Sequence, residues 1–449
     1  MFFNIFKAVV GAGSFALPRA FKAGGIWGSV VGLVLLGLMS DYTIKTMIRT
    51  KDHMQHRGSY PELVRSGLGR AGGVVSKLVY GAIVLTVIGV CTVYLVFCGK
   101  LINNLLSLDC TNVVAPIAGM GAFLAVVSWL PSLKKISFLS LIGDGALLLA
   151  MVCVVVYGFH FYELKPIADY PQFEIKTYMS FYGPVVFLYA IHMLVIPLHN
   201  EMKNPALFER TLDFSLIVVV ISNGLFAMLA FLLFDDAIPL NDPITSALTD
   251  DWGHLNKVVD VALVLDLTFT FTVIFVAGRD VIEQSLGWIE PSFRTHWKRM
   301  VVRTILVGLC TGFAIGLHDY FGVLVDLIAG LTMSPLCFII PPLLYLLNLW
   351  PAEHAKALRG EGGSRIWLWI AWGLNALIIL IGTGTTIYST YGSVSEIIGA
   401  FSGNGTLPCN ANVTMGGNMT SAAASNATTT LLTMLSNATT TAALTTTTL

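Results

Sequence analysis

The chain has 449 residues, of which 55% are hydrophobic and only 12% are charged. Water-soluble domains carry roughly 25% charged residues, and the mean hydropathy here is +0.76. A water-soluble globular protein is therefore excluded, and a polytopic membrane protein is predicted. The formal net charge is zero and no basic face accumulates outside short loops, which argues against a nucleic-acid partner.

Apolar runs of about 20 residues, the length that crosses a hydrocarbon core of ~30 Å, recur along the chain. They predict an all-α polytopic membrane protein with eleven transmembrane helices. In chain order, runs 1 to 11 lie near residues 2–21, 25–47, 74–106, 113–130, 137–162, 177–200, 212–234, 255–281, 300–317, 321–350 and 366–388.

Run 1 contains the segment 7–25, KAVVGAGSFALPRAFKAGG, which is interrupted by Gly11, Gly13 and Pro18. Lipid offers no hydrogen bonds to a loosened backbone, so such an interruption has to face protein, a ligand or a water-filled cavity. It therefore predicts a binding site. The alternative is an ordinary kinked or tightly packed membrane helix, because glycine and proline are common in such helices.

Run 6 is interrupted as well. It reads FYGPVVFLYAIHMLVIPLHNEMKNP, with Gly183 and Pro184 near one end, Tyr189 and His192 at the centre and Pro197 beyond them. Runs 1 and 6 are five apart, the spacing of corresponding helices in a 5+5 inverted repeat. Interrupted helices at corresponding positions of two halves indicate the central site of a transporter.

Five ionisable residues fall inside the runs, where a charge is costly and indicates an ion or proton relay. They are Lys7, Asp144, His192, Asp266 and Asp326. The alternative for each is a buried group bonded to a neighbouring helix, which we favour for Asp326, while a coupling role is favoured for Asp266 near the middle of run 8. Catalytic and metal-binding motifs are missing, so we expect no enzyme, no cofactor and no metal site.

Lysines and arginines lie mainly in the loops after even-numbered runs, near residues 45–70, 134–135, 203–210, 279–303 and 356–365. By the positive-inside rule these loops and the N-terminus are cytoplasmic, and the C-terminus is extracellular or lumenal. The tail 401–449 is rich in Ser, Thr, Asn and Ala and is predicted to be disordered. It holds glycosylation sequons at Asn404, Asn412, Asn418, Asn426 and Asn437.

Five of the seven cysteines fall within apolar runs, where cysteine usually acts as a small hydrophobe. Cys110 and Cys409 are the exceptions, and both are predicted to face an oxidising compartment. A disulfide that ties the tail to the transmembrane body is therefore a hypothesis.

Four segments together resemble the amino acid/auxin permease family. They are GAGSFALPRAFKAGG (11–25), SYPELVRSGLG (59–69), VIPLHNEMKNP (195–205) and RTILVGL with FIIPPLLYLL (303–309 and 338–347). The resemblance covers the chain to about residue 390. It implies a transporter of the LeuT-like inverted-repeat architecture, over residues 1–392, that moves amino acids with a coupling ion. The two repeats are expected near 1–162 and 177–350, followed by the eleventh helix at 366–388.

Within that family, Lys7 and the segment 195–205 resemble the proton-assisted branch for small amino acids. That branch has a histidine where this chain has Asn4, and an acidic-glycine pair where it has Ala190 and Ile191. The resemblance to this branch is thus incomplete.

His192 and the pair Thr268 and Thr270 instead resemble the sodium-coupled neutral amino-acid branch, which carries an asparagine in place of Lys7. The resemblance therefore leaves both protons and sodium open as the coupling ion. We favour protons, because the Lys7 ammonium, about 6 Å of helix rise before Gly11, would repel a sodium ion beside the interrupted helix. The predicted ion-coupling residues are Lys7, Asp144, Asp266, Thr268 and Thr270.

The expected substrate site lies between the two interrupted helices. Unwinding at 11–14 would direct backbone N–H groups and the positive end of a half-helix at a substrate carboxylate, and carbonyls near 189–192 would receive the ammonium group. The predicted binding residues are Gly11, Ala12, Gly13, Ser14, Tyr189 and His192. No charged partner for a substrate side chain faces this site, which favours small or neutral amino acids.

The sequence leaves two further points open. The chain could be an amino acid sensor of the same fold that binds without net transport. Its membrane could be the plasma membrane or a vacuolar or lysosomal membrane.

Overall fold

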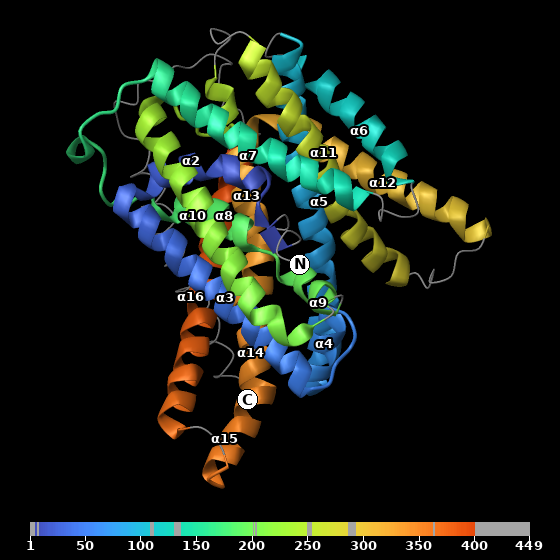
Figure 1. The fold of residues 1–449 in the computed structure, drawn as a ribbon. Coiled ribbons are helices and arrows are strands. Elements are labelled where there is room, and N and C mark those ends of the chain that lie inside the picture. Colours follow the sequence, from blue (N-terminus) through green and yellow to red (C-terminus); the bar gives the residue numbers. More distant parts are fainter. Residues whose placement is uncertain are drawn as a thin grey trace, which may run out of the picture. The chain divides into compact units, whose positions relative to one another are not determined.

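The computed structural model describes residues 5–6, 9–107, 112–129, 136–200, 202, 204–248, 254–285, 293–361 and 364–399. Regular structure in this part of the chain is helical throughout (Figure 1). The main helices are α2 (Ala12–Gly24), α3 (Ile26–His53), α4 (Tyr60–Gly67), α5 (Gly72–Leu105), α6 (Val114–Ser128), α7 (Ile136–Phe161), α8 (Tyr178–Tyr189), α9 (His192–Asn200), α10 (Phe208–Phe234), α11 (His254–Ser285), α12 (Phe293–Gly316), α13 (Phe321–Ile328), α14 (Ile340–Leu344), α15 (Trp350–Leu358) and α16 (Arg365–Gly399). Lys7, Cys110, Cys409 and the five sequon asparagines lie outside the described residues.

Within the described residues, nine helical stretches are long and apolar enough to cross a membrane. Two predicted runs correspond to shorter helices, α2 with 13 residues and α6 with 15 residues. α2 is short because its helix begins only at Ala12, after an interruption. Several helices outlast their apolar runs, as α3 does by ending at His53, because apolarity marks only the part of a helix that lies in lipid.

The first helices pack through small residues. A Cβ at Gly28 would lie 2.7 Å from the ring of Phe173, and one at Gly32 would lie 2.4 Å from the ring of Phe181. These two glycines are one turn apart on α3, so they let α8 and the segment before it approach the α3 backbone closely. α2 packs against α8 and α10, while α11 packs against α5 and α7.

Run 10 contains three π-helical turns, η9 (Ala329–Met333), η10 (Pro335–Ile339) and η11 (Tyr345–Leu349). π-turns widen a helix and often lie at functional sites. The Leu336 carbonyl in η10 accepts a hydrogen bond of 2.8 Å from the Tyr60 hydroxyl. α4 is thereby attached to the middle of run 10.

Several ion pairs between distant segments lie near helix ends. At one end, Arg49 of α3 pairs with Glu209 of α10 at 2.7 Å, and Arg303 of α12 pairs with Glu283 of α11 at 2.7 Å. At the other end, Lys100 of α5 pairs with Asp242.

Candidate functional site between two interrupted helices

The first interruption lies at Val10 and Gly11. The Val10 N–H donates to the Phe6 carbonyl at 2.8 Å, which ends the helical turn before it. Gly11 is extended, with φ −176° and ψ −148°, and α2 begins at Ala12 without a side-chain cap. The first N–H groups of a helix have no partner within that helix, and they carry the positive end of its dipole. The start of α2 is thus suited to bind an anion.

The predicted extent of this unwinding was wrong. Gly13 and Ser14 lie in the first turn of α2, and the Ser14 N–H bonds to the Gly11 carbonyl at 3.0 Å. Within the segment 11–14 only Gly11 is extended, and residues 12–14 are helical. A non-helical backbone is therefore no reason for glycine at Gly13; its reason is space.

The second interruption lies at Ala190 and Ile191, between α8 and α9. Ala190 has φ −79° and ψ 57°, and the Ile191 N–H donates to the Tyr189 carbonyl at 2.8 Å. These values describe an inverse γ-turn, which any residue adopts without strain. The helix is therefore interrupted inside the predicted segment 189–192, and no glycine is needed there.

Both interruptions face one cavity of about 30 Å³. Gly11, directly before α2, and Gly13 in its first turn line it, while Phe187 and Ala190 line it beside the second interruption. Its remaining walls come from α5, α9, α11 and η9 and include Val90, Tyr94, Met193, Ile274 and Met333. The volume suffices for water and is too small for an amino acid, so the structure holds the site closed.

Two aromatic side chains close the cavity against the glycines. A Cβ at Gly11 would lie 3.0 Å from the Tyr94 hydroxyl oxygen, and one at Gly13 would lie 3.0 Å from Cδ1 of Phe187. Neither aromatic residue was predicted from the sequence to lie at the site. Tyr94 could have been found as the tyrosine nearer the centre of run 3, which also holds Tyr80, whereas nothing distinguishes Phe187 from its apolar neighbours.

Tyr189 and His192, predicted as substrate ligands, do not line this cavity. The Tyr189 hydroxyl donates to the Leu33 carbonyl at 3.3 Å, and the Thr43 hydroxyl lies 2.9 Å from Nε2 of His192. The Ser40 hydroxyl donates to the Tyr189 carbonyl at 3.2 Å. All three partners belong to α3, so these side chains fasten the second interruption to that helix.

Ala12 and Ser14, also predicted as ligands, are buried but are not among the residues that line the cavity. The Ser14 hydroxyl oxygen has no hydrogen-bond partner within the described part of the chain. The structure thus brings only Gly11 and Gly13, of the six predicted binding residues, to the cavity wall.

Of the predicted ion-coupling residues, Asp266 and Thr270 lie together, and Asp144 follows a glycine that contacts Asp266. Asp266 of α11 is 1% exposed, and the Thr270 hydroxyl donates to its Oδ1 at 3.4 Å. A Cβ at Gly143 would lie 2.7 Å from the same oxygen, so the α7 backbone next to Asp144 contacts the carboxylate. Thr268 instead bonds to the Val264 carbonyl of its own helix at 2.5 Å. In the described residues, no three His, Cys, Asp or Glu side chains gather to hold a metal.

Along α2, an aromatic cluster and then an ion pair follow the cavity. One turn after Gly11, Phe15 meets Phe97 of α5 at a ring distance of 5.8 Å, and Phe97 meets Phe321 at 5.6 Å, both edge to face. One turn further, Arg19 pairs with Asp326 at 2.9 Å. Asp326 thus pairs with a neighbouring helix, as the favoured interpretation of this residue expects.

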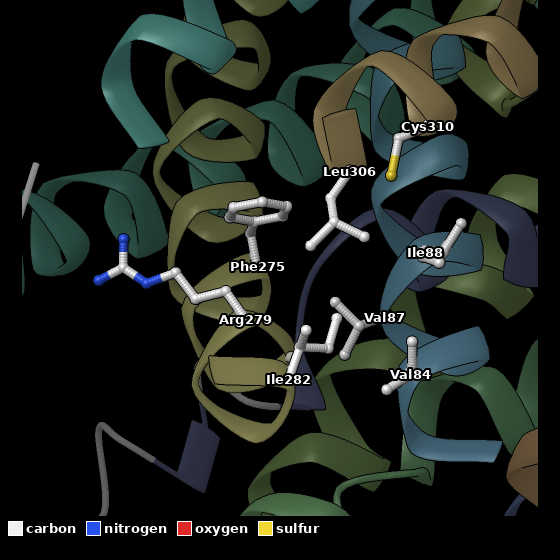
Figure 2. Close-up of a pocket in the computed structure, with 9 residues that line it drawn as sticks. Val84, Val87, Ile88, Phe275, Arg279, Ile282, Leu306 and Cys310 are labelled. Carbon is white, nitrogen blue, oxygen red and sulfur yellow. The ribbon is translucent and has the colours of Figure 1, made fainter. Parts of the chain in front are cut away.

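A second cavity, of about 10 Å³, lies between α5, α11 and α12. Its lining is mostly apolar, and the Arg279 guanidinium points away from it (Figure 2). That guanidinium donates to the Ser128 carbonyl at 3.0 Å. This cavity therefore offers no partners for a zwitterion, unlike the one between the interrupted helices.

Comparison with known proteins identifies the family. The model of the transmembrane amino acid transporter protein family matches residues 1–402. The chain belongs to this family. The resemblance found in the sequence is confirmed, and the family is one of transporters and not of enzymes.

Relatives of this transporter family match most of the chain. The amino acid transporter AVT3A of Arabidopsis thaliana is 26% identical over 417 residues, covering 88% of this chain and 89% of that protein. The proton-coupled amino acid transporter-like protein pathetic of Drosophila melanogaster is 22% identical over 424 residues, covering 89% and 85%.

Among solved structures, the substrate-bound outward-open state of a Na+-coupled sialic acid symporter matches with a TM-score of 0.51 and 10% sequence identity. The match covers 86% of this chain and 88% of that one. At this identity the likeness shows the fold alone, which is an all-helical membrane fold of the LeuT-like kind.

Proposed function

We propose that this transporter binds a small or neutral amino acid as a zwitterion in the cavity between the two interrupted helices. It carries the substrate across the membrane by secondary transport coupled to an ion. The observation that carries the proposal is that the start of α2 and the Ala190 turn face the same cavity.

The two interruptions offer opposite charges to a zwitterion. The first N–H groups of α2 and the Tyr94 hydroxyl would receive the carboxylate. Backbone carbonyls near Ala190, where helical hydrogen bonding is interrupted, would receive the ammonium group. The side chain would face Val90, Ile274 and Met333, which favours a small neutral side chain over a charged one.

Substrate binding requires the cavity to enlarge. Tyr94 of α5 and Phe187 of α8 lie against the glycines, and rotation of these two side chains would open space between α2, α5 and α8. The site is therefore proposed to alternate between this closed arrangement and open ones, as transporters with a central site do.

The proposed architecture has eleven membrane crossings in a 5+5 inverted repeat, with repeats near 1–162 and 177–350. It is supported by the fold likeness and by the pairing of Arg49 with Glu209. Arg49 follows run 2 and Glu209 follows run 6, and eleven crossings would place the segments after even-numbered runs on the same side of the membrane. The N-terminus would be cytoplasmic, and the tail 401–449 would be glycosylated on the other side. A disulfide between Cys110 and Cys409 stays part of this proposal.

Protons are proposed as the coupling ion, with sodium as the alternative. The support is the charge of Lys7 close to Gly11 in the sequence, together with the buried Asp266 carboxylate against α7. A lysine ammonium and a sodium ion would repel each other strongly at such a site. Uptake that needs no sodium and rises as external pH falls is expected; strict sodium dependence at constant pH would overturn the proton proposal.

The test of transport is uptake by the purified full chain in liposomes, screened with each of the twenty labelled amino acids. Binding to the same protein in detergent is measured in parallel. Uptake of small neutral amino acids into sealed vesicles supports the proposal. Binding without uptake would instead indicate a sensor of the same fold.

A further inference from the structure

The end of α9 that lies furthest from the cavity contacts α3 through a buried histidine. Lys51 Nζ lies 3.1 Å from His199 Nδ1, and His199 Nε2 lies 3.9 Å from an oxygen of Asp52. The His199 ring also meets the Phe208 ring of α10 edge to face at 5.1 Å. Lys51 is 4% exposed and His199 is 6% exposed, so water screens this contact little.

The chemistry of the contact requires a neutral imidazole. A lysine ammonium can only donate hydrogen bonds, so Nδ1 of His199 has to accept one and the ring proton lies on Nε2, toward Asp52. Protonation would turn Nδ1 into a donor and place two positive charges 3.1 Å apart. Asp52 is 56% exposed and lies farther from both groups, so it would offset this repulsion only in part.

The His199 contact lies at the last turn of α9, so its release would affect the interrupted helix. α9 is the second half of the interrupted helix and is joined to α8 by the two non-helical residues Ala190 and Ile191. Its first residue, His192, is held to α3 through Thr43, and its last turn is held to α3 through His199. Releasing His199 would therefore free one end of a helix whose other end adjoins the cavity.

We propose that Lys51, His199 and Asp52 form a protonation-sensitive latch in which His199 is a positioning residue. Neutral His199 holds α9 against α3, and protonated His199 releases it. The role of this release in transport rests on the proposed function, whereas the latch itself does not.

Other charged groups near the ring are already paired or lie elsewhere. On α10, Glu209 pairs with Arg49 and Asp213 pairs with Lys45. On α9, Asn200 bonds to His199 through its side chain and carries no charge. Glu201 and Lys203 lie outside the described residues. Lys51 and Asp52 are thus the charged groups of the described chain that face His199.

The latch is tested first by thermal unfolding of the purified full chain in detergent, at about pH 7.5 and about pH 5.5, on either side of the ordinary histidine pKa of ~6.5. The melting midpoint of the native protein is expected to fall on acidification. His199→Gln should show a fall smaller by about 2 °C, because its amide oxygen accepts from Lys51 and does not titrate.

Two further variants assign the effect to the Lys51 contact. Lys51→Gln removes the repulsion and should also reduce the fall, although His199 is retained. His56→Gln is the matched control, because His56 Nε2 contacts the Ser59 carbonyl of its own loop at 3.4 Å, and it should keep the native fall. If His199→Gln or Lys51→Gln keeps the native fall, the latch does not exist.

The role in transport is tested by equilibrium exchange of labelled alanine in liposomes, with equal pH on both sides so that no proton gradient contributes. Acidification should raise the exchange rate of the native protein more than that of His199→Gln. Equal pH profiles would show that releasing α9 does not serve transport. Absence of exchange in the native protein would count against the proposed function, while the unfolding result still decides on the latch.

Discussion

The two helix interruptions differ in how they are made and held. At the first, Gly11 is extended and the start of α2 faces the cavity through two residues without side chains. At the second, Ala190 forms an inverse γ-turn, and Tyr189 and His192 turn away from the cavity to bond with α3. The first interruption depends on empty space, whereas the second depends on side chains that fix its position.

This difference predicts separate effects of substitution. A side chain added at the first interruption should block binding, because it occupies the room a substrate needs. A hydrogen bond removed at the second should leave the cavity intact and alter how firmly the interruption is held. Affinity and transport rate are therefore expected to respond differently at the two places.

Gly13→Val is expected to have the largest effect. Its Cβ would lie 3.0 Å from Phe187, and its two methyl groups would fill a cavity of about 30 Å³. Binding and uptake should both be lost, while the protein still reaches its membrane. Gly13→Ala should cause a partial loss, since Phe187 has to shift only by a few tenths of an ångström. Uptake and equilibrium binding measure both.

Gly145→Val is the matched control for this prediction. It adds the same side chain to α7, where nothing lies within 4 Å of the added Cβ. Uptake should stay near the native level. If Gly13→Val binds amino acids with native affinity, the interruption of run 1 serves packing alone and the substrate site lies elsewhere.

Asp266→Asn should separate ion coupling from both interruptions. The carboxylate lies on α11 against α7 and does not line the cavity, so binding should persist while concentrative uptake is suppressed. The measurement is uptake against a substrate gradient, with and without a pH gradient. Asp319→Asn, at a side chain 62% exposed, is the control. Unchanged pH and sodium dependence in Asp266→Asn would make the residue a structural polar group.

The helical membrane fold was largely predictable from the sequence, because transmembrane helices are recognised by the length and apolarity of their segments. The interruptions were also predictable, since glycine and proline inside an apolar run at corresponding positions of two halves indicate a broken helix. What could not be predicted is the direction of each side chain. Tyr189 and His192 flank an interruption in the sequence, but the sequence does not say toward which neighbour they point. Residues three apart on a helix share a face, and here both side chains bond to α3 and not to the cavity.

The closing side chains were harder still to foresee. Phe187 meets Gly13 only because α8 crosses α2 at that level, and a single sequence carries no record of that crossing. The extent of unwinding was misjudged for a related reason: glycine permits a loosened backbone but does not require one.

Thr43→Val should weaken the second interruption. It removes the hydroxyl 2.9 Å from Nε2 of the buried His192, and a buried polar group left without its partner costs about 1 to 3 kcal/mol. The melting midpoint and the transport rate should fall while substrate affinity stays within a few-fold of native. Thr383→Val is the control, because its exposed hydroxyl bonds only within its own helix. A large loss of affinity in Thr43→Val would contradict the division between the two interruptions.

Ser14→Ala is expected to have the smallest effect. It tests how far the substrate-binding surface extends into α2 from the first interruption. The Ser14 hydroxyl is fully buried, has no hydrogen-bond partner within the described residues and lies one position beyond the cavity wall at Gly13. Removing a buried hydroxyl without a partner should leave the melting midpoint unchanged or raise it. If opening of the site lets the hydroxyl reach the substrate, affinity should fall by one hydrogen bond of about 0.5 to 1.5 kcal/mol, roughly two- to tenfold. Binding and thermal unfolding on the same preparation check both. A hundredfold loss of affinity would make Ser14 a central ligand and extend the binding surface into the first turn of α2.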